Sequence, residues 1–336
     1  MYHHANVPLT GAETTLQVTP MSDLDISSLP KPLKSAFGEL EAWIKSELLA
    51  DQARSVPAFP LYHYTDQTAL RGILEKQQLW CFLHSQQSDP TEVSYSMEIA
   101  RRVIREEAGR GSPPVESLLK GLDDMLASHP LGETFDFYFF SFSRHRDDPG
   151  QWEEYGRKGT GFSIGFAPAL FRPDQTTLLP RATENVFVSR VIYGRDATRT
   201  RHRRGVRKLA RIVGRVAASH PELVHGRNLQ SWFDAMNKLL IADLLIWNCL
   251  TAKHDRYRRE QETRYIILGV RQIFNDWRRS LGKRSYVETS LPLTVGGNVV
   301  EVLVGPRAAA DAEENVRAIL RGHGYSNSIP VTRSSV

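Results

Sequence analysis

Polar residues that could carry chemistry interrupt strands or strand ends in four clusters along the chain, and one of these is Ser88, Asp89 and Pro90 with Glu92. The other three lie at the ends of apolar, strand-like segments. His63 ends one such segment, Ser141 and Ser143 end a second, and Glu260 and Glu262 begin a third. Residues i and i+2 of a strand share a face. Two like charges side by side cost energy unless a cation or a ligand lies between them. The two glutamates are therefore the best indication of a site in the sequence.

The same residues also have structural interpretations. His63 could be a buried structural histidine, and the two serines could be small outward-facing residues of a strand. Glu262 and Arg264 are two residues apart, so they could form an ion pair on one strand face. The segment 260–262 could equally be a solvent-exposed edge. Asp89 could cap a helix that has Pro90 at its first position and an acidic first turn.

Hydrophobic periodicity predicts the elements that would position these residues. Strands interspersed with helices, without regular strand–helix alternation, indicate the α+β class. We expect a central mixed or antiparallel sheet flanked by helices. The expected strands cover residues 60–64, 78–83, 135–143, 161–166, 185–193, 263–270, 286–291 and 299–304, with a last one near 329–331. The longer expected helices cover residues 33–49, 91–107, 196–219, 226–249 and 311–321.

The chain is expected to form one folded domain behind a leader. Residues 1–30 are rich in Thr, Ser and Pro and show little periodicity, which predicts a disordered leader. An N-terminal helical segment, residues 31–58, would follow. Residues 59–335 would form a single α+β domain, with the helices around 196–249 as an insertion.

The composition is that of a globular protein, with 336 residues of which 41% are hydrophobic and 24% charged. The chain begins without a basic segment followed by an apolar run, so no signal peptide is expected. The most apolar stretch, residues 239–250, is shorter than the roughly 20 residues that cross a bilayer. Cys81 and Cys249 lie in apolar segments and are expected to be buried free thiols. These features favour a cytoplasmic protein without membrane contact and leave the oligomeric state open.

Basic residues concentrate in one segment, 195–215, which holds nine Lys and Arg against Asp196 alone. One interpretation is a phosphate-facing patch for a nucleic acid or a nucleotide. The other is a solvated helix face, which the lack of interleaved aromatic residues favours.

Short polar motifs recur in a fixed order over residues 59–335. They are Tyr62, His63 and Tyr64; Asp89, Pro90 and Glu92; Ser141, Phe142 and Ser143; Trp152, Tyr155, Gly156 and Gly159; Lys253, Glu260, Glu262 and Arg264; and Gly305 with Pro306. Their order and spacing resemble a bacterial family called domain of unknown function 2971. The family usually has Asn where this chain has Ser88, and its name carries no function.

A looser resemblance, to the ADP-ribosyltransferase-like superfamily, implies a function. Those enzymes place His-Tyr at the end of the first core strand, Ser-Thr-Ser on a middle strand and Glu-x-Glu before a late strand. This chain has His63, Ser141 and Glu260 with their neighbours in that order, although Phe142 stands where Thr is usual. The resemblance implies an ADP-ribosyltransferase or NAD glycohydrolase that cleaves the nicotinamide–ribose bond of NAD.

The resemblance also implies roles within one cleft. Cleavage passes through an oxocarbenium-like state, which a carboxylate stabilises, and Glu262 is the candidate for this role. The other implied roles are ribose binding by His63 and by Ser143 or Ser141, activation of an acceptor by Glu260, stacking on nicotinamide by Tyr64, Trp152 or Tyr155, and pyrophosphate binding by Lys253 or Arg264.

Two other functions remain open: an effector that binds nucleic acid through residues 195–215, and a sensor that binds a nucleotide without turnover. No Walker or Rossmann glycine loop is present, and no metal is expected, because no dense acidic or histidine set has metal-site spacing. Glu262→Gln is expected to remove activity at an unchanged melting temperature, since an edge ion pair contributes only about 0–1 kcal/mol.

Overall fold

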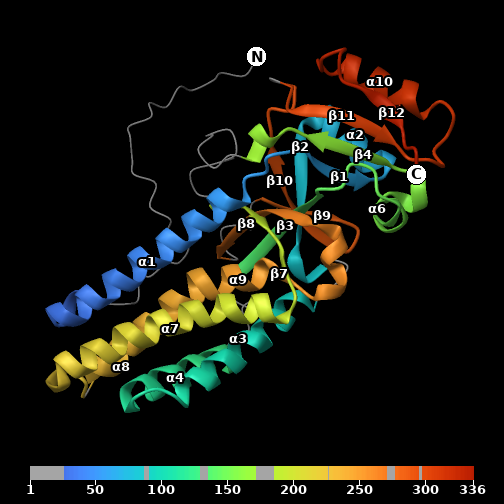
Figure 1. The fold of residues 1–336 in the computed structure, drawn as a ribbon. Coiled ribbons are helices and arrows are strands. Elements are labelled where there is room, and N and C mark those ends of the chain that lie inside the picture. Colours follow the sequence, from blue (N-terminus) through green and yellow to red (C-terminus); the bar gives the residue numbers. More distant parts are fainter. Residues whose placement is uncertain are drawn as a thin grey trace, which may run out of the picture.

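The computed structural model describes residues 26–86, 91–128, 135–171, 185–225, 227–270, 277–294 and 297–336. A mixed β-sheet occupies its centre, and a layer of long helices packs against one side (Figure 1). The α+β class with a central sheet flanked by helices, which the sequence predicts, is confirmed. Most of the expected leader, residues 1–25, and the motif residues Ser88, Asp89 and Pro90 lie outside the described residues.

The strands form one large sheet and one small one. In chain order they are β1 (Leu61–Thr65), β2 (Gln78–Leu83), β3 (Phe135–Ser143), β4 (Phe162–Phe166), β5 (Asn185–Arg190), β6 (Ile192–Tyr193), β7 (Ala252–Lys253), β8 (Glu262–Val270), β9 (Arg278–Leu281), β10 (Arg284–Ser290), β11 (Val299–Val304) and β12 (Val331–Arg333). The large sheet has the order β12-β11-β4-β1-β3-β2-β10-β9, and β8 pairs with both β3 and β5. Strands β6 and β7 form the small parallel sheet.

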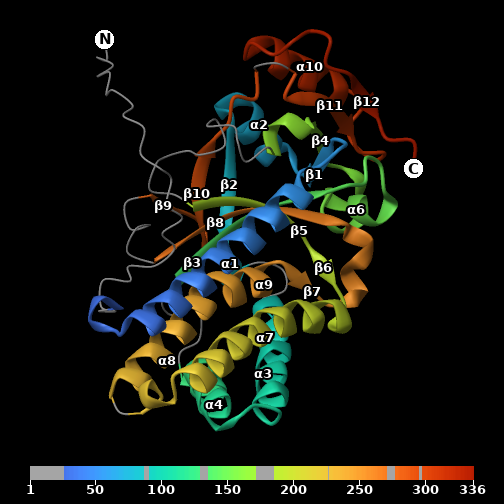
Figure 2. The same ribbon diagram turned by 60° about the vertical axis from the view of Figure 1, so that its left-hand side comes forward.

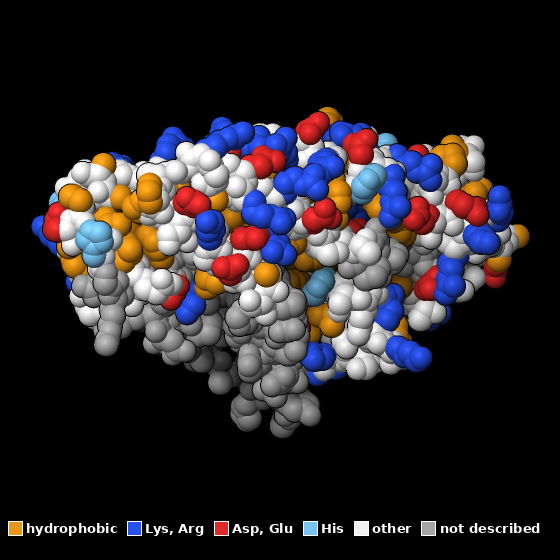
Figure 3. Space-filling view, turned by 90° about the horizontal axis from the view of Figure 1, so that it is seen from below, with side chains coloured by type: hydrophobic (Ala, Val, Ile, Leu, Met, Phe, Trp, Pro, Cys, Tyr) orange, Lys and Arg blue, Asp and Glu red, His pale blue; other side chains and the backbone are white. Residues whose placement is uncertain are grey.

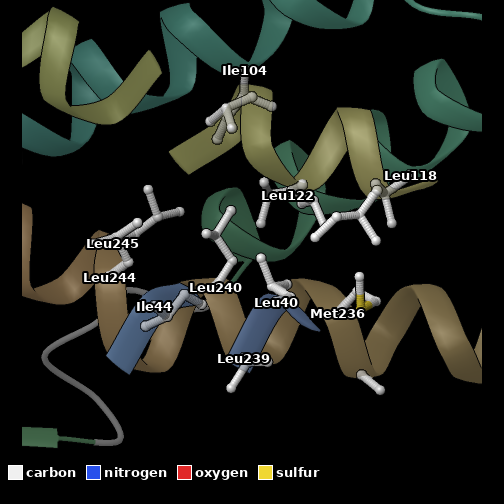
Figure 4. Close-up of a cluster of buried hydrophobic side chains, with 14 of the residues drawn as sticks. Leu40, Ile44, Ile104, Leu118, Leu122, Met236, Leu239, Leu240, Leu244 and Leu245 are labelled. Atoms are coloured by element: carbon white, nitrogen blue, oxygen red, sulfur yellow. The ribbon is translucent and has the colours of Figure 1, made fainter. Parts of the chain in front are cut away.

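The helices divide into a thick layer below the sheet and smaller elements around its upper part (Figure 2). In chain order they are α1 (Lys31–Ser55), α2 (Gln67–Lys76), α3 (Glu92–Ala108), α4 (Pro113–Ser128), α6 (Pro149–Glu154), α7 (Arg195–Ser219), α8 (Arg227–Leu239), α9 (Ile246–Leu250) and α10 (Ala312–Gly322). The layer consists of α1, α3, α4, α7, α8 and α9. Figure 4 shows its interior, where apolar side chains of α1, α3, α4 and α8 meet.

Strand β3 joins the two largest hydrophobic cores of the described residues. Phe137 and Phe139 belong to the core of the helical layer, whereas Tyr138, Phe140 and Phe142 belong to the core on the other side of the sheet. This division follows from the alternation of strand side chains between two faces. The run of aromatic residues in β3 thus reflects a strand that is covered on both faces.

The two edges of β3 are paired differently. One edge pairs with β8 over the full length of the strand. Along the other edge, β1 pairs at Ser143, while β2 pairs at Phe139 and Tyr138. Residues 140–142 lie between these two pairings, so β1 and β2 part at the middle of β3.

Two glycines form a tight backbone junction next to β1. A Cβ atom on Gly161 would lie 2.2 Å from the carbonyl oxygen of Thr65, and one on Gly305 would lie 2.3 Å from that of Gly159. The amide of Gly305 donates to the carbonyl of Gly161 at 2.9 Å. No side chain fits at such distances, so these glycine motifs hold β1, β4 and β11 together.

The basic segment 195–215 forms most of α7, and its cations face acidic neighbours. Seven of its nine basic residues make ion pairs, and their partners are Glu39, Glu47 and Asp51 of α1 and Glu106 and Glu107 of α3. On the face drawn in Figure 3, basic and acidic side chains are interspersed. Much of the positive charge is therefore balanced within the helical layer, an arrangement that neither interpretation of the sequence anticipated.

Some elements differ from the sequence-based expectation. The strand expected over residues 185–193 is two strands, β5 and β6, in different sheets. Strand β9 is not anticipated, because its polar and largely exposed residues carry no apolar alternation. A π-helical turn, Leu240–Leu245, interrupts the helix expected over 226–249. Leu29 falls within the expected leader, yet it is buried in the helical core.

Candidate active site

A cavity of about 390 Å³ opens where β1 and β2 part from β3. This volume is within the usual range for small-molecule sites. Nine of the ten site residues expected from the sequence line it, and Trp152 is the exception. The nine are His63, Tyr64, Ser141, Ser143, Tyr155, Lys253, Glu260, Glu262 and Arg264.

Two buried cations, Lys253 and Arg264, hold three glutamates together in the cavity wall. The Nζ atom of Lys253 lies 3.0, 2.7 and 2.8 Å from carboxylate oxygens of Glu92, Glu260 and Glu262, respectively. Arg264 binds Glu92 and Glu262. These five residues, which we call the glutamate network, carry one formal negative charge when all are ionised. They come from α3, β7, β8 and the 3-10 turn Asp255–Glu260, so the network forms only in the folded chain.

Glu262 is a fully hydrogen-bonded carboxylate. Its Oε1 accepts from Ser141 Oγ at 2.6 Å and from Arg264 Nε at 2.8 Å, while its Oε2 contacts Arg264 Nη2 and Lys253. Burial acts to raise the pKa of Glu262, but Arg264 and Lys253 hold it well below its ordinary value. The residue is 5% exposed and β8 lies between β3 and β5, so Glu262 is not on a solvent-exposed edge.

Glu260 has fewer partners than Glu262. Its Oε1 accepts from the Tyr155 hydroxyl at 2.9 Å, and its Oε2 accepts from Lys253 at 2.7 Å. Burial raises the pKa of Glu260; Lys253 partly opposes this and Glu262 adds to it, so the pKa lies above its ordinary value. Gln261, with φ of 42°, turns the chain between the two glutamates. They therefore meet at Lys253 instead of standing side by side on one strand.

His63 and Ser141 are joined at the point where β1 and β2 part. His63 Nδ1 donates to the backbone carbonyl of Ser141 at 2.9 Å. Burial lowers the pKa of His63 to about 4, so the ring is neutral near pH 7 and Nε2 is an acceptor. Within the described ranges, no residue donates to Nε2. Ser141 is exposed to the cavity, so both residues can contact a ligand.

Three expected site residues hold the loop that follows β3. Ser143 Oγ donates to the carbonyl of Glu260 at 2.9 Å, and the Tyr64 hydroxyl donates to that of His145 at 3.0 Å. Trp152 packs edge-on against Tyr64 and donates its Nε1 to Asp147. Trp152 is only 2% exposed. Trp152 packs against Tyr64 outside the cavity lining and offers no stacking surface to a ligand. The stacking on nicotinamide that the resemblance implies for Trp152 is therefore not available.

Sequence reasoning missed part of this cavity. It counts Glu92 among the motif residues and interprets it as part of a helix start, but it gives Glu92 no role in the site. It also expects Lys253 and Arg264 to meet a pyrophosphate, whereas both are buried against glutamates. No motif marks Arg284, which lines the cavity together with aromatic residues of β2, because strand pairing brings these residues to the site.

Two further features of the described residues concern metal binding and membrane-spanning helices. In the part of the chain that the structure describes, no group of three or more His, Cys, Asp or Glu residues is arranged to hold a metal ion. Over the same ranges, no helix is both long enough and apolar enough to cross a membrane.

Comparisons with curated proteins, solved structures and family models bear on the family of this chain. Neither the curated proteins nor the solved structures contain a match to this chain. A family model described as "Protein of unknown function (DUF2971)" matches residues 151–265. The matched segment includes Tyr155, Lys253, Glu260, Glu262 and Arg264, which line the cavity. Over residues 151–265 the chain is thus similar to the DUF2971 family, in agreement with the motifs of the sequence.

Proposed function

We propose that this protein cleaves the nicotinamide–ribose bond of NAD, as an ADP-ribosyltransferase or an NAD glycohydrolase, in the cavity between β1 and β2. The observation that carries the proposal is the convergence of His63, Ser141, Tyr155, Glu260 and Glu262 on that cavity. These residues come from distant parts of the chain and supply an acceptor, a hydroxyl, an aromatic ring and carboxylates. They are the residue types that the reaction requires.

The charge of the cavity supports a cationic substrate. The nicotinamide ring of NAD is a pyridinium, and its departure moves positive charge onto the ribose. The glutamate network has one more carboxylate than it has cations, and its members are almost entirely buried. A fixed negative charge away from water stabilises such a transition state more strongly than it would in solution.

Within this proposal, Glu260 rather than Glu262 faces the developing charge. Glu262 already accepts from Ser141, Arg264 and Lys253. Glu260 has a single donor on each oxygen, so lone pairs remain for the ribose. Glu262 would then position the two cations, which is a different role from the one implied by the sequence.

The neutral side chains complete the proposed site. Nε2 of His63 can accept a hydrogen bond from a ribose hydroxyl, because Nδ1 carries the proton. The ring of Tyr155 is half-buried in the cavity wall, with its hydroxyl fixed by Glu260, and can stack on nicotinamide.

Release of nicotinamide from NAD, followed by chromatography, tests the proposal. Glu260→Gln keeps the size of the side chain and removes its charge, so we expect a rate loss of about 100-fold or more, corresponding to about 3 kcal/mol. Asp136→Asn is a matched control, since Asp136 is a buried, arginine-paired carboxylate of β3 that does not line the cavity. The control should keep its rate per folded molecule. The proposal is wrong if the wild-type protein releases no nicotinamide, or if both variants behave alike.

A further inference from the structure

Arg284 is a cation of the cavity wall that no described carboxylate neutralises. It is the first residue of β10 and lines the same cavity as the glutamate network. The other lining cations are all paired: Lys253 and Arg264 with glutamates, and Arg157 with Asp66 at 3.0 Å. Arg284 therefore has a charge available for a ligand.

An aromatic ring holds Arg284 in place. Its guanidinium carbon lies 3.8 Å from the ring centroid of Phe82. Phe82 in turn packs against Tyr286, with ring centroids 5.7 Å apart. A guanidinium that lies on an aromatic face keeps its N–H donors pointing outward in its own plane. Partial burial also lowers the pKa of Arg284, since water solvates the group incompletely, and a bound anion would compensate for this.

We propose that Arg284 binds a phosphate group of the substrate, which makes the ligand of this cavity a nucleotide with a cationic base. The orientation of the ligand in the cavity rests on the proposed function, which places the nicotinamide riboside end at Glu260. The strand order β8-β3-β2-β10 places three strand spacings, about 14 Å measured across the strands, between β8 and β10. The two ends are also offset along β3, since Glu262 pairs with Ser143 whereas Phe82 pairs with Phe139. The cavity is negative at one end and positive at the other, as a ligand with a cationic base and an anionic phosphate requires.

Arginine suits this task for geometric reasons. A guanidinium can donate two parallel hydrogen bonds to one phosphate. Since stacking on Phe82 already fixes its plane, little side-chain freedom is lost on binding. Lys253 and Arg264 could bind a phosphate only by breaking their ion pairs with buried glutamates. This would leave buried charges without partners, which is strongly unfavourable.

Inorganic pyrophosphate is a suitable probe, because its binding does not depend on turnover. Calorimetric titration should show binding to the wild-type protein and at least about tenfold weaker binding to Arg284→Gln. Lys283→Gln is the matched control, since it removes the same charge from the adjacent exposed residue of the β9–β10 turn, which does not line the cavity. It should bind like wild type. Absence of pyrophosphate binding, or equal weakening in both variants, would overturn the proposal.

NAD turnover separates this inference from the proposed function. If pyrophosphate binds through Arg284 but NAD is not cleaved, the phosphate site stands and the proposed function fails. If NAD is cleaved and Arg284→Gln leaves the KM for NAD unchanged, the proposed function stands and the phosphate site is wrong. The joint expectation is cleavage with a KM raised about tenfold in Arg284→Gln and unchanged in Lys283→Gln.

Discussion

At the scale of single residues, hydrogen bonding distinguishes the two glutamates that the sequence places two positions apart. Glu262 is tied to Ser141, Arg264 and Lys253, which makes it a structural anchor of the glutamate network. Glu260 has one donor on each oxygen and a raised pKa. The sequence shows that the two glutamates are close together. Only the fold shows that Glu260 is the one whose carboxylate oxygens can accept further hydrogen bonds.

This difference predicts unequal losses of stability for two similar substitutions. Glu262→Gln leaves Arg264 and Lys253 buried with less compensating charge, so we expect the free energy of unfolding to fall by about 3 kcal/mol. Glu260→Gln should lower it less, because only Lys253 loses a charged partner. Urea denaturation of both variants measures this. Unchanged stability of Glu262→Gln, as expected for an exposed edge, would contradict the burial and ion pairing described above.

The raised pKa of Glu260 predicts the acid limb of activity. If the ionised carboxylate is required, activity falls as the pH drops through a pKa that lies above the ordinary value of 4.5. Tyr155 donates to the ionised form, so Tyr155→Phe should move the midpoint to still higher pH. The measurement is the pH profile of nicotinamide release for both proteins. A midpoint that moves downward, or not at all, would exclude Glu260 as the titrating group.

At the scale of elements, the glycine junction fixes the strand that carries His63. Gly161→Ala would place a methyl group against the carbonyl of Thr65, and overpacking of this kind destabilises by about 1–3 kcal/mol. Gly38→Ala is the control, since Gly38 lies in α1 and an added Cβ atom there would have no atom from outside the local helix backbone within 4 Å. There alanine should stabilise by up to about 1 kcal/mol. Thermal unfolding of the two variants should thus shift in opposite directions, and a Gly161→Ala protein as stable as wild type would contradict the junction.

The sequence predicts the bounds of individual strands better than the pairing between them. The bounds of β2 and β3 match the expected ones, because apolar runs between polar loops are a local signal. The parting of β1 and β2, and the approach of Arg284 to Phe82, depend on pairing between distant strands, which no local pattern encodes. The site residues were found because their types are unusual for strand ends. Their hydrogen bonds, and hence the division of roles between the glutamates, could not be found in this way.

At the scale of the whole molecule, the cavity lies where the helical layer meets the sheet. Glu92 is the first residue of α3, and Lys253 follows α9, so both reach the glutamate network from the helical layer. Glu262 and Arg264 reach it from β8. Residues that stabilise the helical layer therefore also keep the network in position.

One such residue makes the molecule sensitive to acid. His202 of α7 is fully buried and hydrogen-bonds Ser96 of α3 at 2.9 Å. Burial, reinforced by Arg201, lowers the pKa of His202 from 6.5 to about 3. Below pH 6.5 the unfolded chain binds a proton that the folded one excludes, so stability falls as the pH drops, by about 2 kcal/mol at pH 5. His202→Gln does not titrate, so urea unfolding at pH 7 and pH 5 should differ less than in wild type. An equal difference would rule out this role.

The products that the pure protein forms from NAD test the central claim most directly. Mass spectrometry of the reaction mixture measures nicotinamide, free ADP-ribose and the mass of the protein itself. We expect nicotinamide to appear in proportion to the NAD consumed, together with free ADP-ribose for a glycohydrolase or an ADP-ribosyl adduct for a transferase. NAD that stays intact at saturating concentration, with no nicotinamide formed, would contradict the claim that this cavity cleaves the nicotinamide–ribose bond.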